Sequence, residues 1–176
     1  MIILYIILMA VAGFLALLLL AALFMKKDHY VKREITIQAP LQKVFDYVRL
    51  LRHQDEFNNR AMIDSDRKRT YRGTDGTVGY VYAWSGNRSA GEGEKEIMSI
   101  VEGKSVEMEI RFMKPMKTSS RIIMETEPLS ENQTRVSWSN AGRLKYPFNL
   151  MVPMMERMLP RDMDASLNNL KTILEK

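Results

Sequence analysis

The sequence predicts an α+β fold: a half-buried antiparallel sheet covered by a C-terminal helix, preceded by one N-terminal transmembrane helix. Three observations lead to this prediction. The first 25 of the 176 residues carry no charged side chain, residues 64–143 alternate between polar and apolar side chains, and residues 162–174 place apolar side chains at helical spacing. A chain of this length has room for one domain of ordinary size besides the apolar segment.

The apolar segment, residues 1–25, is long enough to cross a hydrocarbon core of roughly 30 Å as a helix. It lacks the basic start and small-residue cleavage pattern of a cleaved signal peptide, so we expect a retained anchor. Lys26 and Lys27 follow it directly, and only the α-amino group precedes it. The positive-inside rule then predicts a single-pass protein of the cell membrane whose C-terminal domain faces the cytoplasm, and the absence of cysteine agrees with that reducing compartment.

Three parts are expected along the chain: a transmembrane anchor (1–25), a basic juxtamembrane linker (26–30) and one domain (31–176). The formal net charge of +5 belongs to the last two parts, because every charged side chain follows Met25. The basic segment RKRTYR at residues 67–72 is short and fits no nucleic-acid-binding motif. We interpret it as a solvated strand edge and expect no nucleic-acid partner.

The domain begins with a predicted strand, VKREITIQA, that ends at Ala39. Pro40 suits the first turn of a helix, since its missing N–H would have no partner there in any case. Residues 41–57 then predict two short helices, broken near residues 49–55.

Strands separated by glycine-rich turns follow between residues 64 and 143. The turn GTDGTVG matches neither a GxGxxG fingerprint nor a P-loop. In the later strands the alternation predicts one packed face, formed by Val106, Met108, Ile110 and Phe112, by Ile122 and Met124, and by Val136, Trp138 and Asn140.

The hairpin at residues 76–97 raises a question about carboxylates. Its first arm places aromatic side chains on one face: Tyr80, Tyr82 and Trp84. Its second arm carries Glu92, Glu94 and Glu96 at the same period. The alternation of the residues that follow does not decide whether these glutamates face the core or the solvent. Because three desolvated carboxylates together are very costly, we predict a wet face and a bulge near Gly93.

The C-terminal segment is interrupted at its start by Pro153 and Pro160, so an amphipathic helix is expected from Asp162 onward, with the stripe Met163, Leu167, Leu170 and Leu174. Five of the fourteen methionines gather here: Met151, Met154, Met155, Met158 and Met163. Thioether side chains adapt to irregular apolar space, so two interpretations stay open, an ordinary core helix and the roof of an apolar cavity.

Residue types exclude several chemistries. Without cysteine there is no thiolate nucleophile and no cysteine-ligated zinc site. His29 lies next to the anchor, and His53, near Asp55 and Glu56, is expected at the surface rather than in a catalytic dyad. No HExxH, Gly-x-Ser-x-Gly or EF-hand spacing occurs, so we predict no catalytic residue, metal or cofactor.

The order of one strand, two short helices, six strands and a long helix is the helix-grip arrangement. The segments ITIQAPLQKVFDYV, GTVGYVYAWSG, GEGEKEIMSI and SLNNLKTILEK resemble the START-like (SRPBCC) superfamily, in particular domains of the polyketide cyclase/dehydrase and lipid-transport type. The resemblance implies a START/Bet v 1-like fold, a curved antiparallel sheet around the long C-terminal helix. It also implies a hydrophobic cavity that binds lipids, sterols, polyketides or plant hormones, with cyclisation or hydrolysis in some members.

Together these observations predict a membrane-tethered domain that binds a lipid or another hydrophobic small molecule, without cofactor. Two alternatives remain: an enzyme of cyclase or hydrolase type that uses a cavity carboxylate, and an interaction module whose cavity is filled by its own methionines. The ligand and the oligomeric state stay open. The side chains expected to contact the ligand are Tyr80, Tyr82, Trp84, Met108, Ile110, Phe112, Met124, Trp138, Asn140, Met155, Met158 and Met163.

Overall fold

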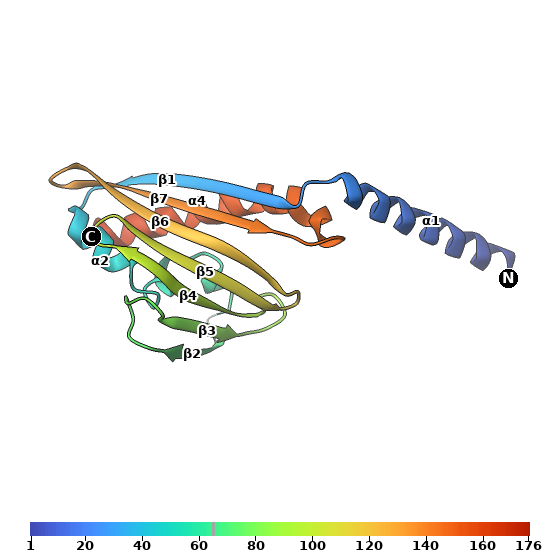
Figure 1. Cartoon of the computed structure of the whole chain (residues 1–176), viewed down its shortest axis with the longest axis horizontal. Coiled ribbons are helices and arrows are strands. Elements are labelled where there is room, and N and C mark those ends of the chain that lie inside the picture. The colour runs from blue at the N-terminus through green and yellow to red at the C-terminus, as the bar shows by residue number, and fades with distance from the viewer. Residues whose placement is uncertain (65) are drawn as a thin grey trace.

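A computed structural model describes residues 1–64 and 66–176 and confirms the α+β class (Figure 1). The helices are α1 (Ile2–Phe24), α2 (Leu41–Val48), α3 (Gln54–Phe57) and α4 (Val152–Leu174), with 3-10 turns η1 (Ala61–Ile63) and η2 (Phe148–Met151). The strands are β1 (Asp28–Ile37), β2 (Lys68–Arg72), β3 (Val81–Ser85), β4 (Glu92–Val101), β5 (Ser105–Lys114), β6 (Thr118–Ser130) and β7 (Gln133–Arg143).

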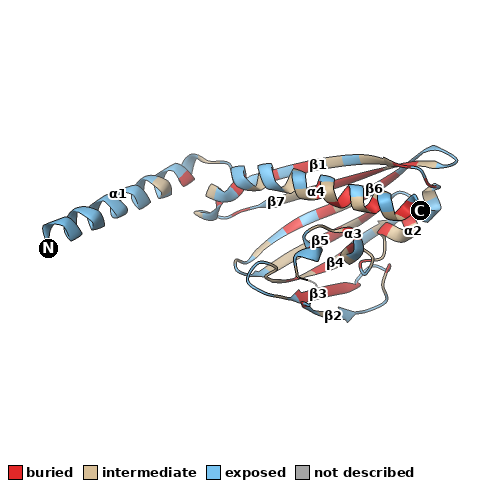
Figure 2. Ribbon diagram, turned by 180° about the vertical axis from the view of Figure 1, so that it is seen from behind, coloured by how far each residue is buried: buried red, intermediate tan, exposed pale blue. Residues whose placement is uncertain are grey.

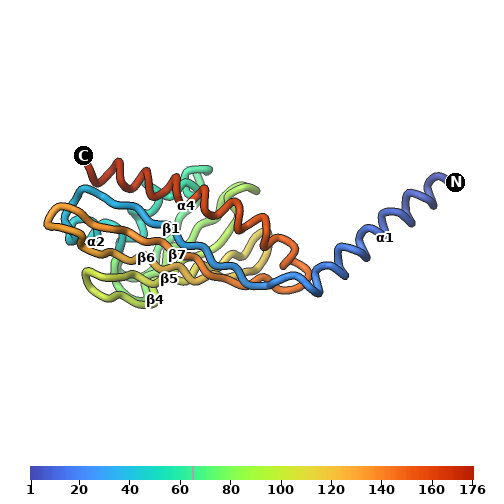
Figure 3. The backbone as a smooth tube through the Cα atoms, turned by 90° about the horizontal axis from the view of Figure 1, so that it is seen from above, coloured from blue at the N-terminus to red at the C-terminus, as the bar shows by residue number. Residues whose placement is uncertain are grey.

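The described strands form one antiparallel sheet in the order β1-β7-β6-β5-β4-β3-β2. The first strand pairs with the last, so both ends of the domain meet on one side of the sheet, and β2 forms the opposite edge. The sheet curves around α4, which runs along its inner side close to β1 (Figures 1 and 3). This is the helix-grip arrangement that the sequence resemblance implies.

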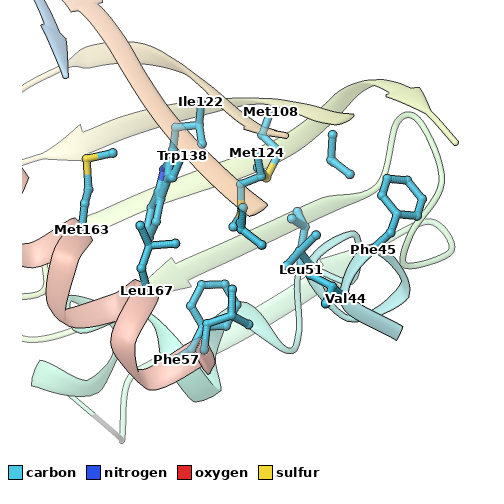
Figure 4. Close-up of a cluster of buried hydrophobic side chains, with 14 of the residues drawn as sticks. Val44, Phe45, Leu51, Phe57, Met108, Ile122, Met124, Trp138, Met163 and Leu167 are labelled. Atoms are coloured by element: carbon cyan, nitrogen blue, oxygen red, sulfur yellow. The ribbon is translucent and has the colours of Figure 1, made fainter. Parts of the chain in front are cut away.

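The core lies between the sheet and α4. The predicted stripe of α4 is buried, and Figure 4 shows Met163 and Leu167 reaching from α4 toward Trp138 of the sheet. At the other end of the core, Val44 and Phe45 of α2 fill the space under the sheet. The alternation along β5 and β6 is confirmed, because the residues predicted to face inward are buried or packed against the core. In β7, Val136 and Trp138 are buried as predicted and Asn140 is half-buried. Ser137 and Ser139, predicted to face outward, are buried as well.

The prediction for the start of the last helix is wrong. Helix α4 is continuous from Val152, and both prolines belong to it. Pro153 lies in the first turn, where a missing N–H has no cost. Pro160 lies inside the helix, where a proline costs about 3 kcal/mol. Packing of this half of the helix over the sheet outweighs that cost, because tertiary contacts override local propensity.

The pairing of β4 with β5 contains two register irregularities. One lies between Glu92 and Gly93, next to the predicted bulge, but the extra residue there is Met113 of β5. The other lies at Met98 and explains why the alternation along β4 does not assign one face to the whole strand. Because Met98 is the extra residue, Ile97 and Ile100 both pack toward the core while Met98 is exposed.

The junction between α1 and the domain is short. Strand β1 begins at Asp28, so residues 28–30, expected to be a linker, belong to the sheet, and the strand ends at Ile37. The buried side chain of Asn149 donates hydrogen bonds to the carbonyl oxygens of Ala22 (2.6 Å) and Met25 (3.0 Å). These bonds satisfy carbonyls that the end of a helix leaves without partners.

Helix α1 itself has the length and hydropathy of a membrane span, a property that N-terminal signal sequences share. It extends away from the domain and is exposed along nearly its whole length (Figure 2).

Candidate functional site

A cavity of about 400 Å³ lies between the sheet and α4. The sheet contributes aromatic and aliphatic side chains from β3, β5, β6 and β7, and α4 covers them with methionines. The methionines line this space without filling it. The cavity-lining methionines of the η2–α4 segment are Met151, Met154, Met155, Met158 and Met163.

Nine of the twelve side chains expected to contact a ligand line the cavity: Tyr82, Trp84, Ile110, Phe112, Trp138, Asn140, Met155, Met158 and Met163. The other three, Tyr80, Met108 and Met124, face inward but lie in the packed core, with at most 1% of each exposed. Val44, Phe45 and Val48 of helix α2 belong to the same packed core.

The rings of Tyr82, Trp84 and Phe112 form an aromatic wall of the cavity, and this wall requires a glycine opposite Trp84. The ring of Trp84 lies 5.7 Å from that of Phe112, edge to face, and 6.1 Å from that of Tyr82. The paired residue on β4 is Gly93, where an added Cβ would lie 2.8 Å from the Trp84 ring and 2.6 Å from a backbone oxygen. The indole N–H donates to the Ala90 carbonyl (3.1 Å). The position of the Trp84 ring is therefore fixed by this hydrogen bond and by its packing against Gly93 and the neighbouring rings.

A polar cluster that the sequence did not predict occupies the inner end of the cavity. Asp55 of α3 accepts hydrogen bonds from Arg67, from Arg69 (2.8 Å) and from the hydroxyl of Tyr82 (2.8 Å). Arg67 also donates to that hydroxyl (2.6 Å). Burial of Tyr82, together with the negative charge of Asp55, raises the pKa of its hydroxyl.

Arg67 corrects the interpretation of the basic segment. Strand β2 is an edge strand, as predicted, and Lys68 and Arg72 are exposed. Arg67, immediately before the strand, is buried and lines the cavity instead. Its long side chain turns inward because Asp55 neutralises the guanidinium there.

Lys95 is the second buried cation of this cluster. Its side chain points inward from β4, and its ammonium donates to the amide oxygen of Gln54 (2.6 Å). The amide nitrogen of Gln54 in turn lies 3.2 Å from the Met108 sulfur. Desolvation lowers the pKa of Lys95 to about 8. The sequence carried a signal for this position, since a strand that points its glutamates outward must point the residues between them inward.

The three glutamates of β4 lie on the outer side of the sheet. Glu94 and Glu96 both accept hydrogen bonds from Arg111 of β5, and Glu92 pairs with Lys114 (2.8 Å). They are half-buried under these partners, and they do not line the cavity. The prediction that these glutamates lie on the outer side of the sheet is therefore correct. They are less exposed to solvent than expected, because their ion pairs with Arg111 and Lys114 cover part of each side chain.

The two histidines have structural partners. His53 is half-buried and stacks on the ring of Tyr47 at 4.4 Å, while Asp55 beside it is bound to the cluster described above. His29, beside the anchor, is buried, and its Nε2 lies 3.1 Å from the amide oxygen of Asn140. Within the described residues, no group of three histidine, aspartate or glutamate side chains could hold a metal ion.

The cavity reaches the surface at the end of the domain from which α1 extends. Strand register places the start of β1 opposite the end of β7, with the turns at 86–91 and 115–117 at the same end (Figure 1). Residues of both turns line the cavity, as does the first half of α4. Met154 of that helix is 50% exposed, so the rim of the opening is apolar on the side of α4.

Comparison with known proteins supports the fold. The sequence profile of the family "Polyketide cyclase / dehydrase and lipid transport" matches residues 28–175. Among curated proteins, no sequence matches the chain significantly.

Solved structures share the fold at low sequence identity. A protein from Chromobacterium violaceum has a TM-score of 0.61 at 14% identity, with 84% of this chain and 97% of that chain covered. A protein from Nitrosospira multiformis has a TM-score of 0.60 at 15% identity, covering 83% and 96%. Norcoclaurine synthase from Thalictrum flavum, in complex with dopamine and hydroxybenzaldehyde, has a TM-score of 0.65 at 10% identity, covering 85% and 87%.

Proposed function

The chain belongs to the polyketide cyclase/dehydrase and lipid transport family of the START-like (SRPBCC) superfamily, and on this basis we propose that it is a membrane-tethered domain that binds a lipid or another hydrophobic small molecule. The observation that carries the proposal is the cavity of about 400 Å³ between the sheet and α4. Its volume lies in the usual range of small-molecule sites, roughly 300–1,000 Å³. The bound norcoclaurine synthase shows that this fold holds small organic molecules.

The lining of the cavity supports an apolar ligand. Trp84, Phe112 and Trp138 give flat apolar surface, and the methionines of α4 adapt to varied shapes. A ligand that buries about 300 Å² of apolar surface gains about 7 kcal/mol from the hydrophobic effect, before the costs of association.

Tethering is supported by the anchor and by the position of the opening. Asn149 fastens the end of α1 to the domain, and the apolar rim around Met154 lies at that same end. A domain held in this way has its opening close to the bilayer, which raises the effective concentration of a membrane ligand. Lys26 and Lys27 beside α1 favour a cytoplasmic domain.

Binding is favoured over acid–base catalysis by the state of the carboxylates. Two carboxylates line the described part of the cavity, and each is already bound by arginine: Asp55 by Arg67 and Arg69, and Asp162 by Arg60 (2.7 Å). The glutamates of β4 lie outside the cavity. We therefore assign no catalytic residue in this proposal.

Native mass spectrometry of the full chain, released from a non-ionic detergent, tests the proposal. We expect a co-purifying apolar molecule that solvent extraction identifies. Met158→Asp, on the cavity wall, should abolish its retention. Met98→Asp, on the outer side of the sheet, should not. A ligand-free mass, with no uptake from a total lipid extract, would contradict the proposal.

Orientation is tested separately. Because the chain has no cysteine, Ser130→Cys at the exposed β6–β7 turn gives a single reactive thiol. A membrane-impermeant maleimide should label it in lysed cells only. Labelling of intact cells would overturn the cytoplasmic orientation.

A further inference from the structure

The charges around the cavity are unbalanced. Its charged lining comprises two carboxylates, Asp55 and Asp162, and five cations, Arg60, Arg67, Arg88, Lys95 and Lys114. Arg60 is bound to Asp162 at one side, Lys114 is paired with Glu92, and Arg88 lies near the opening. Two further cations are both more than nine-tenths buried. Lys95 lies on β4, and Arg67 begins beside the turn at 86–91 and reaches inward with its guanidinium to the hydroxyl of Tyr82.

The inner cations lack sufficient partners for their donors. Asp55 already accepts hydrogen bonds from Arg67, Arg69 and Tyr82. Lys95 donates to the neutral amide of Gln54, and an ammonium has three N–H donors. The buried Nε of Arg67 has no hydrogen-bond partner among the described residues. Buried charges are stable when paired, so this arrangement fits an incoming anion.

We propose that the inner end of the cavity binds the anionic head group of an amphipathic ligand, a carboxylate or a phosphate, through Lys95 and Arg67. The apolar part of the ligand then lies along the aromatic wall, with its far end toward Met154 and the opening. This inference rests on the proposed function and adds the chemical class of the ligand.

The position of Lys95 along the sheet supports this orientation, and the guanidinium of Arg67 reaches the same level by contacting the hydroxyl of Tyr82. From the end of the sheet at which α1 attaches, Trp84 comes first, paired with Gly93. Lys95, paired with Tyr82, lies two residues further in along β4. A head group at Lys95 is thus beyond the aromatic wall, and the chain behind it passes that wall on its way to the opening.

The two tryptophans of the chain, Trp84 and Trp138, both line the cavity, so their fluorescence reports its occupancy. The test uses the full chain in nanodiscs of zwitterionic phosphatidylcholine. The probes are 12-bromododecanoic acid, whose bromine quenches tryptophan, and the neutral 12-bromododecan-1-ol of the same length. We expect the acid to bind at least tenfold more tightly than the alcohol.

Variants then assign the difference to the head-group site. Lys95→Met should weaken binding of the acid at least tenfold and leave binding of the alcohol unchanged, which also shows that the variant is folded. Lys104→Met, at an exposed turn, is the matched control and should change neither. Competition by dodecyl phosphate against the bromo-acid distinguishes the two head groups: displacement at lower concentration than dodecanoate assigns a phosphate, and the reverse assigns a carboxylate.

Different quenching results would contradict the head-group site and the proposed ligand binding. Equal quenching by acid and alcohol, unaffected by Lys95→Met, would overturn the head-group site and leave apolar binding intact. No quenching by either probe would contradict ligand binding itself.

Discussion

Replacing Lys95 by methionine should stabilise the protein at neutral pH while it removes anion binding. The pKa of Lys95 is lowered from 10.5 to about 8 by burial, so holding its charge in the folded state at pH 7 costs about 3 kcal/mol. Methionine has a similar shape and no charge to desolvate. It leaves the Gln54 amide oxygen without its donor, which costs about 1–2 kcal/mol. The expected net gain is about 1–2 kcal/mol.

The sign of the pH dependence separates this explanation from simple repacking. Below pH 8 Lys95 is protonated in both states, and the folded state carries the full penalty. Between about pH 8 and 10.5 the folded protein loses this proton while the unfolded chain keeps it, so the stability of the wild type rises with pH. The neighbouring groups that face Lys95, namely Asp55, Arg67 and Tyr82, are the same in both proteins. The advantage of the variant must therefore be present at pH 7 and shrink toward pH 10.

Thermal unfolding of the full chain in detergent, followed by tryptophan fluorescence, measures this difference. A gain of about 1–2 kcal/mol corresponds to a Tm roughly 2–8 °C higher at pH 7 for a protein of this size. Lys104→Met is the control and should stay within about 0.5 kcal/mol of the wild type, because the residue is exposed. A Lys95→Met protein that is less stable than the wild type by the same amount at pH 7 and pH 10 would refute the reasoning.

Three further outcomes are expected from other parts of the molecule. Leu170→Ala removes a fully buried side chain of α4 and should cost about 2–5 kcal/mol, seen as a lower Tm; a change below 1 kcal/mol would mean that α4 is not held as described. Asn149→Ala should speed tryptic cleavage after Lys26, because two carbonyls at the end of α1 lose their donor; unchanged cleavage, compared with an exposed Asn132→Ala control, would contradict that role. Glu96→Gln should leave quenching by the bromo-acid unchanged, since this carboxylate faces Arg111 outside the cavity; a tenfold loss would place it in the site.

Much of the fold follows from two periodicities in the sequence. The period of two in β5, β6 and β7 assigns inward residues correctly because one face of the sheet meets a core and the other does not. The apolar stripe of α4 is equally clear, since Met163, Leu167 and Leu170 recur at helical spacing and are all buried. What fails is the start of that helix. Pro160 carries a strong local signal, and the long-range packing that outweighs it has no signature in the neighbouring residues.

The periodicity is less informative about the cavity, because it assigns a face and not a position along the strand. Met108 and Ile110 have the same parity on β5, yet Met108 is enclosed by the core while Ile110 borders the cavity. The difference comes from the short helices, because Gln54 of α3 contacts Met108 beside the core residues of α2, whereas Ile110 lies further along the strand at the cavity. Where a helix stops covering a sheet depends on the three-dimensional path of the loops, which the pattern of a single strand does not contain.

The polar end of the cavity shows how a correct local inference can still miss a site. The argument that desolvation keeps Glu94 and Glu96 outside also requires Lys95, between them, to point inward. A buried lysine is acceptable only with a partner, and its partner Gln54 lies 41 residues earlier in the chain, on a helix of four residues. Arg67 likewise depends on Asp55, which the sequence presents only as a neighbour of His53. Alternation therefore indicates that a charge is buried, whereas the contact that makes the burial possible exists only once α3 is folded against the sheet.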